Sequence, residues 1–259
     1  MRAVITGASS GIGRDIARYL SAKGVELVLV ARREDRLRQL AEELSVPAEV
    51  YPCDLSDPAA CVELYRRVSA RPVDILINNA GFGVFGAFDE TELDRELKLI
   101  DVNIRALHIL TKLFYRDFVE RDSGRILNVS SSAAFVPGPL LSAYYASKAY
   151  VLRLTEALHE ELRRKGSRVT VSVFCPGPVD TEFDALADVR FHVKGLRSEQ
   201  AAKAAVDGMF HGRLVIVPGP LMKVVHVGSR LLPDRLLLHL AWHMQSRKRQ
   251  RKHAGEERP

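Results

Sequence analysis

Residues 6–13 read Thr6-Gly7-Ala8-Ser9-Ser10-Gly11-Ile12-Gly13, and they join a short apolar run at residues 3–5 to an amphipathic stretch over residues 12–23. Glycines at such a junction permit a tight turn and let backbone N–H groups approach a phosphate at the N-terminus of the following helix. The spacing G-x-x-x-G-x-G differs from the common dinucleotide fingerprint G-x-G-x-x-G. The stretch therefore predicts a strand, a glycine turn and a helix, and its function depends on what the rest of the chain supplies.

The alternation of strand and helix continues along the chain. Further short runs rich in β-branched residues or leucine occupy residues 26–30, 50–52, 75–77, 125–129, 170–174 and 214–217. Amphipathic stretches separate them, at residues 33–44, 57–69, 91–119, 143–165 and 198–210. Strands this short and apolar suit a parallel sheet that is covered by helices on both faces. We therefore predict an α/β fold, with a single doubly wound Rossmann-type domain over residues 1–220 and a mostly parallel sheet.

The pattern changes after Pro220, where residues 221–259 read as a C-terminal helical extension and basic tail, not an independent domain. Two amphipathic stretches are separated at Leu232-Pro233, because proline breaks a helix. Their apolar stripes are predicted at Leu221, Val224, Val225, Gly228, Leu231 and Leu232, and at Leu236, Leu237, Leu240, Ala241 and Met244. Apolar helix faces of this kind are normally buried against another surface. We expect, in order of preference, the rest of the domain, a partner subunit or a membrane surface.

Composition and charge place the chain among ordinary globular proteins. Apolar residues make up 47% and charged residues 27%. The net charge is +6, and residues 247–259 hold six Lys/Arg and two Glu. Most of the positive charge therefore lies in the tail, where runs of solvated charge are common, and we expect no nucleic-acid partner. Three cysteines with no C-x-x-C pair, no secretion signal and no long apolar segment predict a cytoplasmic protein, with peripheral membrane contact through the extension as the alternative.

The end of the second predicted strand bears on the choice of dinucleotide. The sequence there is Ala31-Arg32-Arg33. In a Rossmann-type domain a carboxylate at this place binds the ribose 2′-hydroxyl of NAD, whereas an arginine can pair with the 2′-phosphate of NADP. Arg32 therefore favours NADP(H) over NAD(H). We assign Arg33 to the start of the solvated helix that follows.

Tyr144 and Lys148 lie four residues apart on a predicted helix, so their side chains share one face. Ser131 precedes Tyr144 by thirteen residues, at a strand end. A tyrosine that shuttles protons near neutrality needs its pKa lowered from ~10, at a cost of roughly 4 kcal/mol. One ammonium about 4 Å away contributes ~1 kcal/mol in water but ~4 kcal/mol at an effective dielectric near 20. The pair therefore predicts a partly desolvated pocket.

Together these motifs resemble the short-chain dehydrogenases/reductases. The sequences T-G-x-x-x-G-I-G at 6–13, N-N-A-G at 78–81, Ser131, Y-x-x-x-K at 144–148 and P-G-x-V-x-T at 176–181 occur in the family's order, over roughly residues 1–220. Two features depart from the common pattern: Ala133-Ala134-Phe135 follows Ser131 where many relatives have a glycine, and the C-terminus is not the usual family ending. Both departures concern the substrate.

The resemblance implies four catalytic residues. Ser131 would hydrogen-bond the substrate carbonyl, and Tyr144 would exchange a proton with its oxygen. Lys148 would lower the pKa of Tyr144 and hold the nicotinamide ribose. Asn103 would kink its helix and position a water beside Lys148. The same register makes Tyr145 a packing residue and selects Ser131 over its neighbours Ser130 and Ser132.

The resemblance also implies a cofactor site. Its residues would be Gly7, Ser9, Ser10, Gly11, Ile12, Gly13, Arg32, Asp54, Leu55, Asn79, Ala80, Gly81, Tyr144, Lys148, Val179 and Thr181. Asp54 and Leu55 would border the adenine, Asn79 would supply hydrogen bonds near the adenosine ribose, and Val179 and Thr181 would hold the nicotinamide carboxamide.

The implied activity is that of an NADP(H)-dependent oxidoreductase that acts on a carbonyl or secondary alcohol, as a homodimer or homotetramer. Apolar residues in the substrate segments hint at a lipophilic ketone or a 3-oxoacyl substrate: Ala134, Phe135, Pro137, Leu140, Leu141, Phe183, Leu186 and Phe191. The alternative is a non-catalytic NADP(H)-binding redox sensor or interaction module on the same fold. His239 and His243 have the spacing of zinc ligands but lack a third ligand, so we predict no metal.

Overall fold

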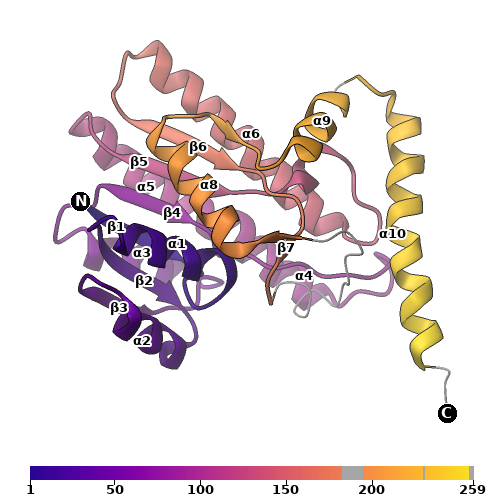
Figure 1. Ribbon diagram of the computed structural model, residues 1–259, viewed down its shortest axis with the longest axis horizontal. Helices are drawn as coiled ribbons and strands as arrows, with labels where there is room; N and C mark the ends of the chain where they lie inside the picture. Colours follow the sequence, from indigo (N-terminus) through magenta and orange to yellow (C-terminus); the bar gives the residue numbers. More distant parts are fainter. Residues whose placement is uncertain (183–194, 230, 257–259) are drawn as a thin grey trace.

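A parallel sheet of seven strands forms the centre of the computed structural model, which describes residues 1–182, 195–229 and 231–256 (Figure 1). The strand order is β3-β2-β1-β4-β5-β6-β9. The strands are β1 Arg2–Thr6, β2 Glu26–Ala31, β3 Ala48–Pro52, β4 Ile75–Asn78, β5 Arg125–Val129, β6 Thr170–Phe174 and β9 Val215–Ile216. The doubly wound α/β fold predicted from the alternating pattern is confirmed.

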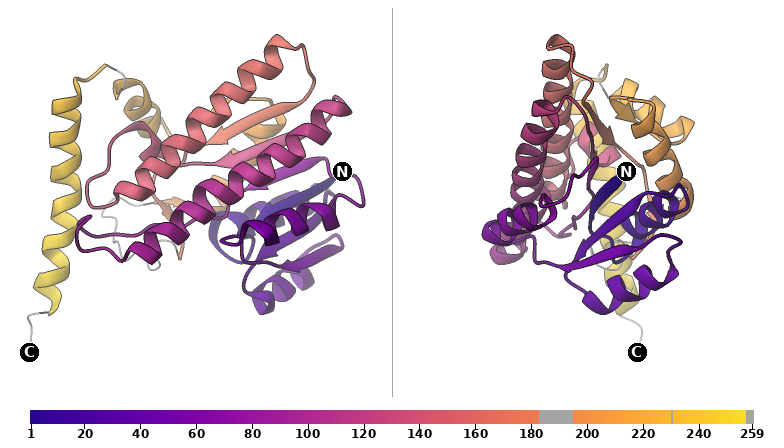
Figure 2. Two further views of the ribbon diagram at one scale, coloured as in Figure 1. Left: turned by 180° about the vertical axis from the view of Figure 1, so that it is seen from behind. Right: turned by 90° about the vertical axis from the view of Figure 1, so that its left-hand side faces the viewer.

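Helices cover both faces of the sheet because successive residues of a buried strand point to opposite sides. On one face Ala3 and Ile5 of β1 pack with α1 Gly11–Ser21, α2 Glu34–Glu43 and α8 Ser198–Phe210. On the other face Val4 packs with α3 Pro58–Val68, α5 Leu107–Glu120 and the end of α6 Ser142–Arg164. Figure 2 shows these two helical layers with the sheet between them.

The chain crosses from one side of the sheet to the other between β1 and β4. Strand β1 pairs with β2 through Ile5 and Leu29, and with β4 through Ile5 and Ile77. In open parallel sheets, ligands bind beyond the carboxyl ends of the strands at such a switch point. The fold therefore places the glycine turn after β1 and the N-N-A-G segment after β4 next to each other.

The predicted helix over residues 91–119 is interrupted. The structure has α4 Leu93–Ile100, a π-helical segment η1 at Asp101–Ala106, and then α5. Single π-helical turns inside α-helices are rare and occur often at functional sites. The interruption contains Asn103, whose buried side chain is held by backbone groups of another segment, as described below. Hydrophobic periodicity alone does not reveal this change of helix type.

Residues after Gly219 form two helices, as predicted, with the break at Leu232-Pro233. They are α9 Pro220–Gly228 and α10 Asp234–Glu256, and both lie at the end of the molecule toward which the strands run (Figures 1 and 2). Ala241 and Gln245 of α10 are buried. The prediction that the apolar stripe of α9 packs on the domain is partly wrong, because Val224 in that stripe is 67% exposed. Within the described residues, no helix is long and apolar enough to cross a membrane.

One short strand pair and one 3-10 turn are further elements of the fold. Strands β7 Val179–Asp180 and β8 Leu196–Arg197 form a separate parallel pair that the sequence pattern does not predict. The segment η2 Ser132–Phe135 is a 3-10 turn directly after β5. Both elements follow strand ends, so they contribute backbone to the same edge of the sheet as the glycine turn.

Candidate active site

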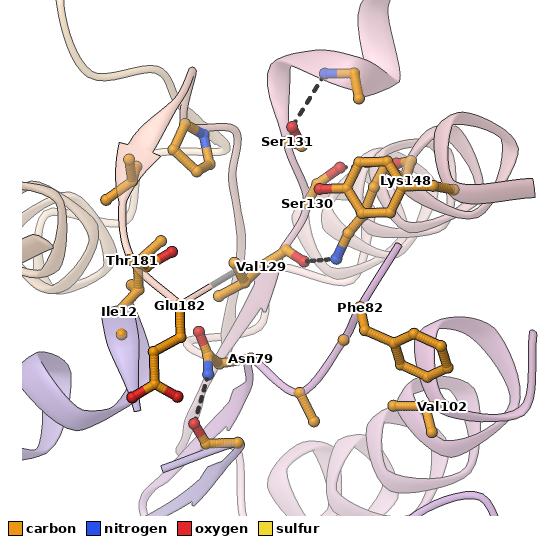
Figure 3. Close-up of a pocket in the computed structure, with 18 of the residues that line it drawn as sticks. Ile12, Asn79, Phe82, Val102, Val129, Ser130, Ser131, Lys148, Thr181 and Glu182 are labelled. Carbon is orange, nitrogen blue, oxygen red and sulfur yellow. Dashed lines mark hydrogen bonds between the residues drawn. The ribbon is translucent and has the colours of Figure 1, made fainter. Parts of the chain in front are cut away.

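A cavity of about 880 Å³ opens beyond the carboxyl ends of the strands (Figure 3). It is lined by nearly all of the predicted site residues: Gly7, Ser9, Ser10, Gly11, Ile12, Arg32, Asp54, Leu55, Asn79, Ala80, Gly81, Ser131, Tyr144, Lys148, Val179 and Thr181. Gly13 and Asn103 are the two predicted residues that lie behind this lining. The fold therefore brings together residues that are spread over more than two thirds of the chain.

The glycine turn is shaped by backbone conformations and contacts that side chains would obstruct. Gly7 and Gly11 have φ angles of +68° and +52°, in the left-handed region that glycine favours. A Cβ atom on Gly13 would lie 2.3 Å from the carbonyl oxygen of Gly7. Gly13 therefore permits the first turn of α1 to pack against the loop, and the helix N-terminus, which attracts anions, faces the cavity.

Asn79 fixes this turn from the neighbouring strand. Its Nδ2 atom donates hydrogen bonds to the carbonyl oxygens of Thr6 at 3.0 Å and Gly7 at 3.1 Å. The family resemblance predicts that Asn79 supplies hydrogen bonds near an adenosine ribose. In the structure its amide nitrogen holds β4 and the glycine turn together, and its contact with a cofactor stays a prediction.

Arg33 reaches the glycine turn, which the sequence analysis did not predict. Its Nη2 atom donates to the hydroxyl oxygens of Ser10 at 3.0 Å and Ser9 at 3.2 Å. Its Nη1 atom pairs with Glu182 Oε2 at 3.2 Å, and Arg36 also pairs with Glu182. Arg33 stands at the N-cap position directly before α2, close to the predicted helix start, but its guanidinium points back into the cavity. The sequence feature that could have indicated this role is the pair of consecutive arginines, Arg32 and Arg33, at the end of β2.

Tyr144 and Lys148 share one face of α6, as their spacing predicts. Lys148 is buried, and its Nζ atom donates to the carbonyl oxygen of Val129 at 3.0 Å (Figure 3). The same atom lies 5.7 Å from the centre of the Tyr144 ring. Burial lowers the pKa of Lys148 to about 8. The ammonium is thus held between β5 and the tyrosine by a backbone oxygen.

The environment of Tyr144 favours the protonated phenol. Burial raises the pKa of Tyr144, and a hydrogen bond with the Ser131 side chain opposes that increase in part. The family resemblance predicts that Lys148 lowers this pKa, and in the structure desolvation, which raises it, is the largest effect. Tyr144 therefore carries its proton at neutral pH, and Ser131 lies within hydrogen-bonding reach of it.

The Asn103 side-chain amide links the segment after β4 to helix α6. The side chain accepts a hydrogen bond from Phe82 N at 3.1 Å and donates to Phe82 O at 3.0 Å and to Ser147 Oγ at 3.0 Å. Ser147 Oγ in turn donates to the carbonyl oxygen of Tyr144 at 2.7 Å. The predicted irregularity of the helix at Asn103 is present as the π-helical segment, and the predicted water beside Lys148 stays a prediction.

Gly81 lies close to the side chains of both Asn103 and Lys148. A Cβ atom on Gly81 would lie 3.0 Å from Asn103 Oδ1 and 3.3 Å from Lys148 Nζ. A side chain at position 81 would make these neighbours move by a few tenths of an ångström, so glycine suits the close packing of N-N-A-G against the site. On the opposite wall the Thr181 side chain covers Gly11, because a Cβ there would lie 3.1 Å from Thr181 Cγ2.

The outer end of the cavity is apolar and is partly built by the extension. Leu141 is buried and packs with Phe85, Tyr144 and Tyr145. Gln245 of α10 donates a hydrogen bond of 2.6 Å to Tyr145 Oη. Tyr145 is thus a packing residue, as expected, and it also ties the extension to the cavity wall.

The predicted substrate segments reach the cavity only in part. Of their apolar residues, Leu141 lines it, whereas Ala134, Phe135, Pro137 and Leu140 do not. Phe183, Leu186 and Phe191 lie outside the described residues. From the extension, Leu221, Met222, Val225 and Gln245 line it. Met222 packs so closely on the loop after β6 that a Cβ on Gly177 would lie 2.8 Å from its Cγ atom.

Comparison with known proteins identifies the family. Residues 1–188 match the family model described as short chain dehydrogenase. The chain belongs to the short-chain dehydrogenase/reductase family. A short-chain dehydrogenase from Sphingobium yanoikuyae, solved in complex with NADPH, has a TM-score of 0.81 and 32% identity, over 89% of this chain and 93% of that one. This match confirms the Rossmann-type fold and makes the chain a relative of oxidoreductases with nicotinamide cofactors.

Two further relatives differ from the first in cofactor or in size. A family member from Burkholderia phymatum, solved in complex with NAD, has a TM-score of 0.80 and 25% identity, over 89% of this chain and 92% of that one. The very-long-chain 3-oxoacyl-CoA reductase of Homo sapiens is 34% identical over 172 residues, which are 63% of this chain and 55% of that protein. The chain thus matches only about half the length of the human enzyme.

Proposed function

We propose that the protein is an NADP(H)-dependent oxidoreductase that interconverts a carbonyl group and a secondary alcohol, with Tyr144 as the acid/base. The observation that carries this proposal is the convergence of Ser131, Tyr144 and Lys148 at one wall of the cavity, beside the glycine turn. A nicotinamide cofactor, when bound, supplies or accepts the hydride. The protein's own task is to bind and orient both reactants and to move one proton.

The protonated phenol of Tyr144 suits the reductive direction. In that direction Tyr144 donates its proton to the carbonyl oxygen, while Ser131 donates a second hydrogen bond to the same oxygen. The buried ammonium of Lys148 favours the phenolate that remains, because an opposite charge nearby lowers the pKa of a tyrosine. In the oxidative direction the phenolate accepts the proton of the alcohol.

The cavity suits a dinucleotide that bears an extra phosphate. The helix N-terminus at Gly11 and the glycine turn fit a pyrophosphate. At the end of β2, Ala31 offers no carboxylate, while the side chains of Arg32 and Arg33 border the cavity. We assign the 2′-phosphate of NADP(H) to these two guanidinium groups.

The substrate we propose is a lipophilic ketone or a 3-oxoacyl compound. Leu141, Met222 and Val225 give the outer end of the cavity an apolar lining. The activity named for the human relative, reduction of a very-long-chain 3-oxoacyl-CoA, is consistent with this class. The alternative function, a non-catalytic NADP(H)-binding sensor, requires the cofactor site but makes no use of Ser131 and Tyr144.

Oxidation of NADPH against a panel of ketones, aldehydes and 3-oxoacyl thioesters tests the proposal. We expect turnover with at least one apolar carbonyl compound, and a higher kcat/KM as its alkyl chain lengthens. Tight NADPH binding in calorimetry together with no turnover across the panel in either direction would favour the sensor instead.

We also propose that the protein assembles into a homodimer or homotetramer through α4, α5 and α6. Leu93, Leu97 and Ile100 share one face of α4 and are exposed, as is Tyr150 of α6. Apolar side chains gathered in this way commonly mark a subunit interface. Sedimentation at micromolar concentration tests this assembly, and a monomer there would contradict it.

A further inference from the structure

The C-terminal extension exposes an unusually large number of apolar side chains. Of the fifteen large apolar side chains that are exposed in the described part of the chain, nine lie between residues 221 and 242, which is less than a tenth of the sequence. On α9, Val224 and Val227 are 67% and 59% exposed, and Leu231 in the following turn is 80% exposed. Concentrated apolar exposure of this kind marks a surface that contacts something else.

The inward face of the same extension is already occupied. Met222 packs on Gly177, the Phe135 and His226 ring centres are 4.2 Å apart, and Gln245 is bonded to Tyr145. The exposed apolar side chains are therefore not the ones through which the extension packs on the domain. Val224 and Val227 project from α9 on the side opposite to Met222, because a helix turns 100° per residue.

The charge of the protein is concentrated in the same segment. Residues 221–252 contain eight Lys/Arg and one acidic residue, a balance of +7, whereas the whole chain carries +6. The remainder of the chain therefore has a net charge of −1. Five of the basic residues follow the exposed apolar segment on the last turns of α10: Arg247, Lys248, Arg249, Arg251 and Lys252.

We propose that the extension docks this protein onto an anionic lipid bilayer. Apolar side chains next to a run of basic residues fit the two layers of such a surface, since the former enter the acyl boundary and the latter face the phosphates. A second copy of the chain fits less well, because each copy would bring a segment of charge +7 to the contact. A nucleic acid would match the charge but offers no place for the leucines and valines.

The docked position would also place the cavity at the lipid surface. Leu221, Met222 and Val225 of α9 line the cavity, while Val224 and Val227 of the same helix face outward. A single short helix thus separates the bilayer from the apolar end of the site. Docking does not depend on the proposed reaction, so binding and catalysis can be tested separately.

Trp242 offers a direct probe, because it is the only tryptophan in the sequence and is 49% exposed on α10. We expect its emission to shift to the blue when the full-length protein meets vesicles of phosphatidylcholine and phosphatidylglycerol, and brominated lipid to quench it. Vesicles of phosphatidylcholine alone should bind at least tenfold more weakly, and added salt should weaken binding to the anionic vesicles.

Two variants locate the contact. Val224→Ser with Val227→Ser removes apolar area, and Arg247→Gln with Lys248→Gln and Arg249→Gln removes charge. Each should weaken binding to anionic vesicles about tenfold or more. The matched controls, Phe88→Ser for an exposed apolar side chain and Arg66→Gln with Arg67→Gln for exposed charges, should bind as the unchanged protein does. Circular dichroism melts establish that all four variants are folded.

Three results would overturn the proposal. The first is an unchanged Trp242 emission at saturating anionic lipid. The second is vesicle binding that survives in both the apolar and the charge variants. The third is a blue shift that grows with protein concentration without lipid and accompanies a dimer abolished by the Val224 and Val227 changes, which would assign this face to a second copy of the chain.

Discussion

The Nη2 atom of Arg33 lies 3.0 Å from Ser10 Oγ, so the end of β2 is tied to the residue that precedes α1. The bond brings a guanidinium to the mouth of the glycine turn, and Arg32 also borders the cavity. The distinction between a phosphorylated and an unphosphorylated adenosine ribose would therefore depend on two adjacent arginines, of which the sequence analysis favoured only the first.

Arg33→Ala should weaken NADPH binding while leaving NADH binding nearly unchanged. A hydrogen bond to a charged group contributes ~1.5–3 kcal/mol, which corresponds to roughly a 10- to 100-fold increase in Kd. Calorimetric titration with both cofactors provides the comparison. Arg38→Ala, on the exposed side of α2, serves as the control. Equal losses of affinity for NADPH and NADH would show that Arg33 holds the turn without recognising a phosphate.

Asn103→Ala should lower both stability and turnover. The substitution leaves the partly buried backbone groups of Phe82 without their side-chain partner, at a cost of about 1 kcal/mol or more in the free energy of unfolding. It also frees Ser147, which is bonded to the carbonyl oxygen of Tyr144. Urea denaturation and steady-state kinetics measure the two effects. If stability falls but kcat is unchanged, Asn103 only supports the loop.

Lys148 should make the stability of the protein depend on alkaline pH. Its pKa is about 8 in the folded state and near 10.5 when exposed, so between these values the unfolded chain binds more protons. Stability from this group therefore increases as pH rises from ~8 to ~10, and the loss below ~8 reflects the cost of burying the charge. The sign is opposite to that of a lysine in an ion pair.

The measurement is the difference in unfolding free energy between the unchanged protein and Lys148→Met, determined without cofactor near pH ~7 and pH ~10. Taking the difference removes the alkaline titration of the tyrosines and cysteines that both proteins share. The difference should shift in favour of the unchanged protein at the higher pH. A pH-independent difference would mean that Lys148 is not desolvated.

Tyr145→Phe should affect the substrate more than the cofactor. It removes the hydroxyl that accepts the 2.6 Å hydrogen bond from Gln245 but keeps the ring that packs beside Leu141. Loss of one such bond, worth ~1 kcal/mol, should raise KM for an apolar carbonyl substrate about fivefold at constant NADPH affinity. An unchanged KM would indicate that α10 does not shape the occupied site.

Much of the site could be predicted because its residues follow strand ends in a fixed order. Gly7, Asn79 and Ser131 each come directly after a predicted strand, and the parallel sheet brings those ends to one edge. Tyr144 and Lys148 are related by helical spacing alone. For such residues, the predicted strand or helix is enough to predict where the side chain lies in the site.

The features that could not be predicted depend on contacts between distant segments. Gln245 meets Tyr145 across one hundred positions of the sequence. Arg33 turns toward Ser9 and Ser10 because α1 and α2 begin at the same edge of the sheet, which no periodicity encodes. Val224 points outward because Met222, on the opposite side of α9, packs on the domain. The apolar pattern of the sequence does not distinguish the side of the helix that faces the domain from the side that does not.

The central claim is that Tyr144 is the proton donor and acceptor, and Tyr144→Phe tests it most directly. The substitution removes the hydroxyl but keeps the ring against Tyr145 and Leu141. Turnover of an apolar carbonyl substrate should fall by at least about a hundredfold, in keeping with the usual contribution of general acid catalysis. NADPH affinity, measured by calorimetry on the same preparation, should change by less than about twofold. Full turnover by a Tyr144→Phe protein with normal NADPH affinity would contradict this account of the reaction.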